Sequence, residues 1–312
     1  MHNITRVVFM GTPEFSVPCL KLLLEEKYEV VAVITQPDKP KGRGKKLCPP
    51  PVKEFALEHG LPVLQPDKIK TEEFISAMHA INPELIVTAA YGKILPKALL
   101  DLPPYGCINV HASLLPKYRG AAPIHWAVIN GEKKTGITTM MMDEGLDTGD
   151  MLVKSEVEIS QDMTTGELHD ILKELGASAL KQTLDLLKQG TLKRIPQNND
   201  EATYAPMITK DIGKIDWKQS SHNIHNLVRG TNPWPGAFAY YRGERLKIWK
   251  TVLCDFPACS DKPGTICKIA KDALWVVTGD GAIKVTEVQF DNCRKMGVCE
   301  CGHNVKTGEI LE

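Results

Sequence analysis

The sequence predicts an α/β protein: a parallel β-sheet covered by helices, followed by a small all-β domain. In the first two thirds of the chain, short apolar runs alternate with segments whose apolar residues recur at helical spacing. That alternation is typical of βαβ units and of a Rossmann-like sheet. In the last third, short strand-like runs follow one another between turn residues, which indicates an antiparallel sheet or barrel. A length of 312 residues fits two domains of ordinary size.

The first domain begins with a strand, a turn and a helix. Residues 5–10 (TRVVFM) are a short apolar run, residues 11–13 contain Gly and Pro, and residues 15–24 carry apolar side chains at helical spacing. Further strands are expected at 29–35, 61–64, 85–90 and 106–110, with helices at 52–59, 71–80 and 164–187. Thr164 and Glu167 have the spacing of a capping box, which predicts where the last helix begins.

The sequence pattern changes after residue 192. Residues 193–207 contain two Pro, two Asn and one Asp, and we interpret them as a linker between a catalytic domain at 1–192 and a second domain at 208–312. One short helix is expected at residues 222–230. Strands are expected at 238–241, 246–252, 264–269, 273–278 and 282–288. Strands this short, separated by turns, predict a small OB-like β-barrel.

Composition excludes several classes of protein. The hydrophobic fraction of 43% and the charged fraction of 24% are ordinary for a soluble globular protein. No apolar run approaches the roughly 18 residues that a spanning helix needs, and the start of the chain lacks the pattern of a signal peptide. The nine cysteines are scattered, which favours reduced thiols and a cytoplasmic location. We expect a monomer with no membrane partner.

Charge is balanced over the whole chain but not locally. Lys plus Arg equals Asp plus Glu, at 38 each, so the overall charge indicates no nucleic-acid partner. Residues 38–53 are the exception, with six basic side chains against one acid, and their Gly and Pro content predicts a loop. Such a loop suits contact with a phosphate backbone, although charge runs are often only solvated surface.

Two polar segments lie where ligands bind such a sheet, at the carboxyl ends of its strands. Asn109 and His111 are two residues apart in an expected strand, so their side chains share one face. An amide and an imidazole side by side can donate hydrogen bonds to one oxyanion, and the imidazole can transfer protons near neutral pH. Residues 143–150 (DEGLDTGD) form a polar turn from which a carboxylate could reach the imidazole. A structural histidine and an ordinary turn remain alternatives.

Residues 109–124 (NVHASLLPKYRGAAPI), together with the turn at 143–150, resemble the formyltransferases that use 10-formyltetrahydrofolate. Supporting stretches lie at 10–15 (MGTPEF), 35–53, 90–96 (AYGKILP) and 231–237 (TNPWPGA). The resemblance implies a Rossmann-like formyltransferase domain followed by a barrel that lies along tRNA. Within that family, the resemblance of the basic loop and of the second domain implies that the acceptor is the α-amino group of initiator methionyl-tRNA, which is formylated for translation initiation.

The resemblance also implies roles for individual residues. Asn109 and protonated His111 would stabilise the tetrahedral oxyanion, while Asp147 would pair with His111 and accept the proton of the amine. Phe15 would contact the methionyl side chain. The folate pocket would be formed by Ser113, Leu114, Leu115, Pro116, Tyr91, Ile94 and Leu95. The tRNA would be bound by Arg43, Lys39, Lys41, Lys45 and Lys46.

Other functions stay open at this point. The acceptor could be a small amine, such as an amino-sugar nucleotide or glycinamide ribonucleotide, or the chain could be a non-catalytic RNA-binding protein. The first strand is not followed by Gly-x-Gly-x-x-Gly, which argues against a dinucleotide cofactor. We expect no metal, because Cys293, Cys299 and Cys301 with a nearby His have poor spacing for zinc. His222 and His225 are interpreted as part of a polar helix surface.

Overall fold

The computed structural model describes residues 4–41, 46–256 and 261–312. Its contacts divide the chain into two compact units. The first comprises Met1–Pro123, Thr135–Val157 and His169–Ala205, and the second Ile124–Lys134, Glu158–Leu168 and Pro206–Glu312. Most of the segment that we interpreted as a linker therefore belongs to the first unit.

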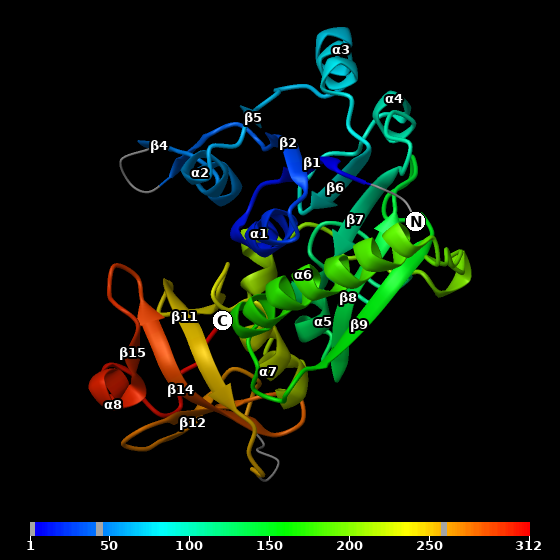
Figure 1. The fold of residues 1–312 in the computed structure, drawn as a ribbon. Helices are drawn as coiled ribbons and strands as arrows, with labels where there is room; N and C mark the ends of the chain where they lie inside the picture. Colours follow the sequence, from blue (N-terminus) through cyan, green and yellow to red (C-terminus); the bar gives the residue numbers. More distant parts are fainter. Residues whose placement is uncertain (1–3, 42–45, 257–260) are drawn as a thin grey trace. The chain divides into compact units, whose positions relative to one another are not determined.

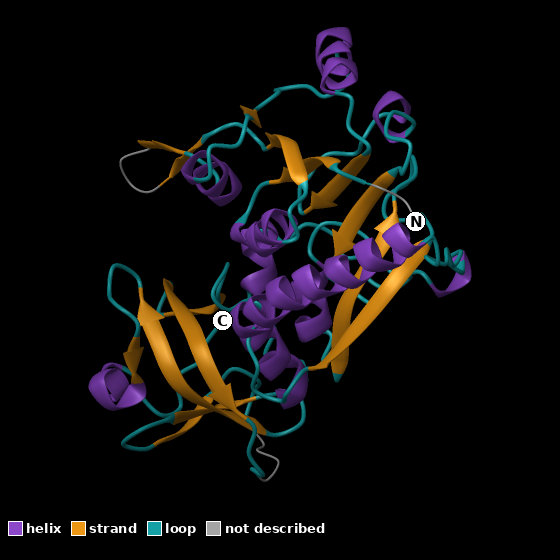
Figure 2. Ribbon diagram, viewed as in Figure 1, coloured by secondary structure: helices purple, strands orange, loops and turns teal. Residues whose placement is uncertain are grey.

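The core of the first unit is a seven-stranded sheet within the described residues (Figures 1 and 2). Its strands are β1 (Arg6–Gly11), β2 (Glu29–Ile34), β5 (Val63–Leu64), β6 (Leu85–Ala89), β7 (Cys107–His111), β8 (Lys134–Met141) and β9 (Met151–Glu158). They are ordered β5-β2-β1-β6-β7-β8-β9. Parallel pairing joins β5, β2, β1, β6 and β7 in turn, which confirms the predicted parallel sheet over this part.

Beyond the predicted parallel strands, the sheet has an antiparallel edge. Strand β8 runs antiparallel to β7, with Asn109 opposite Met140 and His111 opposite Thr138. Strands β8 and β9 are neighbours joined by residues 142–150. Because a connection this short cannot make a parallel crossover, β9 has to return antiparallel to β8. Antiparallel strands at the edge of a parallel sheet are common in α/β proteins.

Helices cover both faces of this sheet. The helices and 3₁₀ turns of the first unit are η1 (Glu14–Ser16), α1 (Val17–Glu25), α2 (Pro51–Glu58), α3 (Glu72–Ile81), α4 (Lys97–Leu100), most of α6 (Thr165–Gln189) and η2 (Asn199–Glu201). Helix α5 (Pro123–Ile129) belongs to the second unit except for its first residue. On one face, Met10 of β1 packs in a buried cluster with Phe74 of α3. On the other, α6 lies so close to β7 that a Cβ on Gly176 would sit 3.2 Å from Val110 Cγ1 and 3.9 Å from Cys19 Sγ of α1. Burial of both faces explains the apolar strands.

The predicted capping box at the start of α6 is confirmed. Thr164 Oγ1 accepts a hydrogen bond from the backbone N–H of Glu167 over 3.2 Å. The Glu167 carboxylate in turn accepts from the backbone N–H of Thr164 over 2.8 Å. Each side chain therefore satisfies a backbone donor that the first helical turn leaves without an intrahelical partner.

We expected residues 38–53 to form a loop, but part of this segment forms two short strands. Strands β3 (Lys39–Lys41) and β4 (Lys46–Cys48) pair antiparallel, with Lys39 opposite Cys48. We call these two strands and their connection the basic hairpin.

The second unit is an antiparallel barrel, as predicted. Its elements are η3 (Lys210–Gly213), α7 (Ser221–Gly230), β10 (Ala237–Tyr241), β11 (Glu244–Val252), β12 (Ile266–Ile269), β13 (Leu274–Val277), β14 (Ala282–Phe290), β15 (Met296–Gly297), α8 (Val298–Cys301) and η4 (Gly302–Asn304). The strand order is β10-β11-β14-β13-β12, with β15 paired to β14. Leu311 forms a bridge with Tyr241 of β10, at one edge of the sheet. Ile310 forms a bridge with Thr265, next to β12 at the other edge, so residues 310–311 close the sheet into a barrel.

Helix α7 packs into the barrel core, and this placement corrects our interpretation of one histidine. Ile224 and Val228 of α7 belong to the same buried cluster as Ile248 and Val285 of the barrel strands. His225 is only 3% exposed, so it does not lie on a polar helix surface. An amphipathic helix buries residues three and four apart, and His225 is adjacent to that buried stripe.

Candidate active site

Asn109 lies on β7, and its side-chain amide is oriented by the neighbouring strand. Thr88 of β6 is opposite Asn109, and its hydroxyl donates a hydrogen bond to Asn109 Oδ1 over 2.8 Å. Because the amide oxygen accepts this bond, the NH2 group of Asn109 points away from Thr88. None of the described residues accepts a hydrogen bond from that NH2 group. It is available to donate to the oxygen atom of a ligand.

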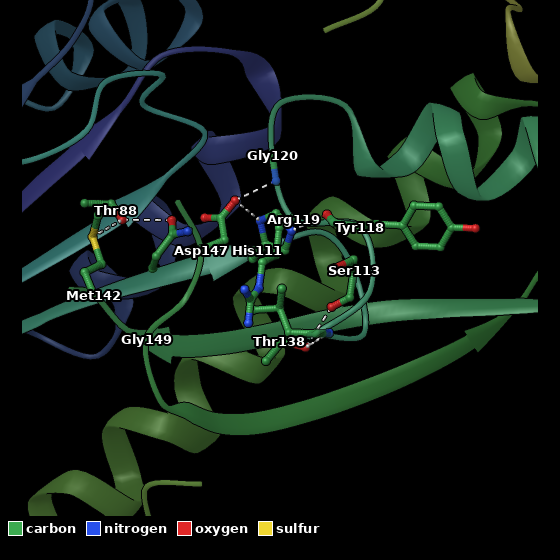
Figure 3. A network of polar contacts seen from close by, with 12 residues as sticks. Thr88, His111, Ser113, Tyr118, Arg119, Gly120, Thr138, Met142, Asp147 and Gly149 are labelled. Carbon is green, nitrogen blue, oxygen red and sulfur yellow. Dashed lines mark hydrogen bonds and ion pairs between the residues drawn. The ribbon is translucent and has the colours of Figure 1, made fainter. Parts of the chain in front are cut away.

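His111 ends the same strand and is buried. Its Nε2 lies 2.9 Å from the backbone carbonyl oxygen of Tyr118. A carbonyl can only accept, so Nε2 carries a hydrogen and Nδ1 is the nitrogen at which a proton is gained or lost. Nδ1 lies 3.7 Å from Asp147 Oδ2 (Figure 3).

Asp147 comes from the turn between β8 and β9. Its carboxylate oxygen Oδ2 accepts a hydrogen bond from the backbone N–H of Gly120 over 2.8 Å, as Figure 3 shows. The residue has a φ of 53°, in the left-handed region that Asp tolerates better than most residues. The turn packs tightly on the end of β8, where a Cβ on Gly149 would lie 1.8 Å from the carbonyl oxygen of Met141.

The fold thus brings together the three residues that we predicted to be catalytic. Asn109 and His111 share one face of β7 by alternation, and the carboxylate of Asp147 reaches His111 from a turn 36 residues further along the chain. An amide donor, an imidazole and a carboxylate in this arrangement can stabilise an oxyanion and move a proton. The roles themselves stay a prediction.

The predicted folate segment at 113–116 is held against the antiparallel edge of the sheet. The hydroxyl of Thr138 on β8 donates to the Ser113 carbonyl over 2.7 Å and accepts from the Leu115 backbone N–H over 3.1 Å. Lys154 on β9 donates to the Leu115 carbonyl over 2.6 Å. The Leu115 side chain is fully buried, whereas Leu114 and Pro116 are partly exposed.

The second predicted folate segment follows β6. Ile94 is 53% exposed, whereas Leu95 and Tyr91 are buried in the core cluster beside α3. Burial raises the pKa of the Tyr91 phenol to about 12. Its hydroxyl has no hydrogen-bond partner among the described residues. A buried hydroxyl without a partner is unfavourable unless a ligand or water satisfies it.

Phe15 and the basic side chains are the remaining predicted site residues. Phe15 lies on η1, directly after β1, and its buried ring is 5.6 Å from the ring of His169. Lys39 and Lys46 are exposed on the basic hairpin, and Lys41 ends β3. Arg43 and Lys45 lie outside the described residues.

Two residues beside this site, Arg119 and Gln197, have no role predicted from the sequence. Arg119, which is 2% exposed, lies between the two backbone groups that contact His111 and Asp147. Gln197 donates two hydrogen bonds to the backbone of the Asp147 turn. Arg119 belongs to the motif used for the resemblance, but nothing marks it as buried. Gln197 lies in a segment without periodicity, so no sequence signal indicates its contacts.

Two other predictions concern metals and membranes. Among residues 4–41, 46–256 and 261–312, no group of three or more His, Cys, Asp or Glu side chains is placed to hold a metal ion. Within the same residues, no helix combines the length and the apolar character that crossing a membrane requires.

Residues 5–184 match the formyl transferase family, and residues 207–303 match the formyl transferase C-terminal domain. The chain belongs to the formyl transferase family. The first match contains the whole site around Asn109, His111 and Asp147. Family membership confirms the resemblance stated from the motifs.

Relatives match this chain over nearly its full length and theirs. A methionyl-tRNA formyltransferase of Acetivibrio thermocellus is 60% identical over 98% of this chain and 99% of the relative. The methionyl-tRNA formyltransferase of Clostridioides difficile is 51% identical, again over 98% of this chain and 99% of the relative. Both matches include the catalytic domain and the barrel.

Solved structures share the fold at low identity. A sugar 3N-formyl transferase, determined with dTDP and 5-N-formyl-THF, gives a TM-score of 0.69 at 20% identity, covering 94% of this chain and 100% of that one. HypX from Aquifex aeolicus in complex with tetrahydrofolic acid gives 0.64 at 16% identity, covering 99% of this chain and 51% of that one. These likenesses confirm the parallel-sheet domain followed by an antiparallel one.

Proposed function

We infer that this protein transfers the formyl group of 10-formyltetrahydrofolate to the α-amino group of methionine on initiator methionyl-tRNA. It is a formyltransferase by family, and relatives that are 51–60% identical over 98% of its length are methionyl-tRNA formyltransferases. One structural observation supports the chemistry above all. The free NH2 group of Asn109 and the His111–Asp147 pair lie at one end of the sheet, where an oxyanion can be bound.

In the first step, the methionyl amine attacks the formyl carbon attached to N10 of the folate. The ester next to the amine lowers its basicity, so a useful fraction is neutral at pH 7. Attack converts the formyl oxygen into an oxyanion. The Asn109 NH2 group and the protonated ring of His111 stabilise it, and loss of one such donor typically costs about 10²–10³ in rate.

Proton transfer completes the reaction. The attacking amine gives a proton to Asp147, directly or through a water molecule, as the new carbon–nitrogen bond forms. The bond between the formyl carbon and N10 then breaks, and N10 takes up the proton held by Asp147, directly or through a water molecule, so that Asp147 is a carboxylate again at the end of the reaction. Asp147 Oδ2 lies 3.7 Å from His111 Nδ1, so the carboxylate that accepts the proton is next to the imidazole.

The segments at 91–95 and 113–116 are proposed to bind the folate. Both follow strands at the carboxyl edge of the sheet, and the second is held by Thr138 and Lys154. The buried hydroxyl of Tyr91, which lacks a partner among the described residues, could bond to a polar ring atom of the folate. Structural relatives solved with folates share this fold.

The tRNA is proposed to contact the basic hairpin and the barrel. Arg43, Lys39, Lys41, Lys45 and Lys46 would meet the phosphate backbone of the acceptor stem, while Phe15 would meet the methionyl side chain. Residues 208–312 carry 15 basic and 12 acidic side chains, a small excess that suits the same partner. Because the proposed substrate serves translation initiation, we place the protein in the cytoplasm.

The proposal is tested by following labelled formyl from 10-formyltetrahydrofolate to three acceptors in parallel. These are methionyl initiator tRNA, methionyl elongator tRNA and glycinamide ribonucleotide. We expect strong transfer to the initiator alone. In Asp147→Asn, kcat should fall by about 10²–10⁴, the range for loss of a general acid or base.

Glu144→Gln is the matched control, because this exposed carboxylate lies on the same turn and pairs only with Lys97 at 3.7 Å among the described residues. Its rate should stay within about twofold of the parent. Transfer only to a small amine would overturn the tRNA assignment. Binding of tRNA without any formyl transfer would indicate a non-catalytic RNA-binding protein instead.

A further inference from the structure

We propose that Gln197, held by Arg119, is a positioning residue that sets the place of Asp147 in the active site. The inference rests on the proposed formyl transfer and adds to it a part of the catalytic unit that lies after α6. Neither side chain contacts the reacting atoms in this proposal. They act through the backbone on both sides of the His111–Asp147 pair.

The side-chain amide of Gln197 uses both of its ends. Its NH2 group donates hydrogen bonds of 2.8 Å to the carbonyl oxygens of Asp147 and Gly149. Its Oε1 accepts two hydrogen bonds from Arg119, over 3.1 Å from Nε and 2.8 Å from a terminal nitrogen. One amide thus links the turn that carries the carboxylate to the guanidinium of Arg119.

Arg119 is a suitable anchor because it is itself held in several ways. A second hydrogen bond from its terminal nitrogen reaches Asn199 Oδ1 over 2.9 Å. Its backbone N–H donates to the Thr203 carbonyl over 2.8 Å, and its carbonyl accepts from Ala205 N–H over 2.7 Å. A buried guanidinium with a fixed planar fork orients its acceptors more strictly than an ammonium would.

The neighbours of Arg119 are the two groups that fix the catalytic pair. The carbonyl of Tyr118 accepts from His111 Nε2, and the N–H of Gly120 donates to the Asp147 carboxylate. The hydrogen bonds of Arg119 therefore fix the backbone of residues 118–120, which contacts both His111 and Asp147. Through Gln197, Arg119 also holds the backbone of Asp147, so both partners are set from the same anchor.

This support matters because the geometry of Asp147 is demanding. The residue has a positive φ of 53°, which costs energy for any residue other than glycine, and its carboxylate is 3.7 Å from His111. The two hydrogen bonds from Gln197 fix the carbonyl groups of Asp147 and Gly149, and so stabilise this turn. A displacement of about 1 Å at a reacting group can cost about 10²-fold in rate.

Steady-state kinetics of Gln197→Met test the proposal, since methionine keeps the length of the side chain but neither donates nor accepts as an amide does. We expect kcat to fall by about 10–100-fold, with KM for folate and for tRNA within about twofold. Asn198→Ala is the matched control. Asn198 is exposed on the same segment and bonds only locally, to Glu201 and Asp200, among the described residues. It should retain the parental rate.

A double-mutant cycle separates positioning from general loss of structure. If Gln197 acts through Asp147, then adding Gln197→Met to Asp147→Asn should change kcat by less than about twofold. A further loss as large as that in the parent protein would overturn the proposal. Gln197→Met with parental kcat would overturn it as well.

A measurement made without substrate tests the positioning role of Gln197 independently of whether the protein transfers formyl groups. The ring signals of His111 can be observed by NMR in the full chain at one fixed pH. Moving the carboxylate away from the ring changes the electric field at its atoms, so the chemical shifts of the His111 ring should change in Gln197→Met in the same direction as in Asp147→Asn. Unchanged ring shifts would contradict the positioning role even if formyl transfer itself were absent.

Discussion

A Cβ atom on Gly120 would lie 2.9 Å from the carbonyl oxygen of Ala205. Gly120 also has a φ of 116°, which side-chain-bearing residues rarely adopt. The close approach follows from the pairing of residues 119 and 204, which brings the segment after α6 against the strip of backbone beside His111. Position 120 therefore requires glycine, and the backbone N–H of this residue is the one that donates to the Asp147 carboxylate.

Gly120→Ala should lower both stability and activity. The backbone must leave its present conformation, at a cost of roughly 1–3 kcal/mol, and its N–H then moves away from the Asp147 carboxylate. We expect a melting temperature lower by several degrees and a kcat at least about tenfold lower. Gly60→Ala is the control, because Gly60 has a φ of 66° but no atom within 4 Å of the added Cβ. Equal losses of kcat in both variants would contradict this account.

Thr88→Val should reduce catalysis by freeing the Asn109 amide. Valine keeps the volume and β-branching of threonine but removes the hydroxyl that donates to Asn109 Oδ1. The amide can then rotate, and its NH2 group is no longer aimed at the oxyanion. We expect kcat to fall about tenfold, less than the loss from removing the donor itself. Thr88→Ser keeps the hydroxyl and should restore most of the rate; if it does not, orientation by Thr88 is unimportant.

Lys53→Met should weaken tRNA binding through the base of the basic hairpin. Lys53 Nζ donates to both carboxylate oxygens of Asp38, at 2.8 and 2.9 Å, and to Gln65 Oε1 at 2.6 Å. Hydrogen bonds from Lys53 and then Gln65 lower the pKa of the Asp38 carboxyl. Asp38 directly precedes β3, so its release disturbs the hairpin.

The expected result is a KM for tRNA raised about threefold to tenfold, with the KM for folate unchanged. Lys21→Met serves as the control, since Lys21 is an exposed lysine of α1 that pairs with Glu25. An equal rise in the KM for folate would argue against a separate tRNA-binding role for the hairpin.

The barrel should lose stability below about pH 6.5 because of His225. Burial lowers the pKa of this histidine, outweighing the hydrogen bond to the Gln161 carbonyl and the nearby charge of Asp162; Arg229 and His222 lower the pKa further. Between the folded pKa and the unfolded value of 6.5, the unfolded chain binds more protons. Stability is therefore complete above about pH 6.5 and falls as the pH drops through the folded pKa.

Urea unfolding followed by tryptophan fluorescence checks this pH dependence. All five tryptophans lie in segments of the second unit, so the signal reports on the barrel unit. Between pH 7.5 and 5.5, the parent protein should lose more unfolding free energy than His225→Gln. Parallel curves for the two proteins would show that His225 does not titrate with unfolding.

The elements of the fold could be predicted where the sequence is periodic. The apolar runs at 29–35 and 85–90, the helical stripe from 164 and the capping box are local features, and the structure has them within a few residues. Strand alternation likewise placed Asn109 and His111 on one face of β7. The antiparallel direction of β8 was not predictable from its sequence, because a buried strand has the same run of apolar residues whether it pairs parallel or antiparallel.

By itself, the sequence determined the family, the parallel core of the sheet, the barrel and the three polar residues of the candidate site. Only the tertiary structure decided how those residues are held. The hydrogen bonds of Arg119 to Gln197 join residues 78 apart, and those of Gln197 to the Asp147 turn span about 50. Contacts of this kind leave no period in the chain, because they depend on where the fold places two segments rather than on the spacing within either one.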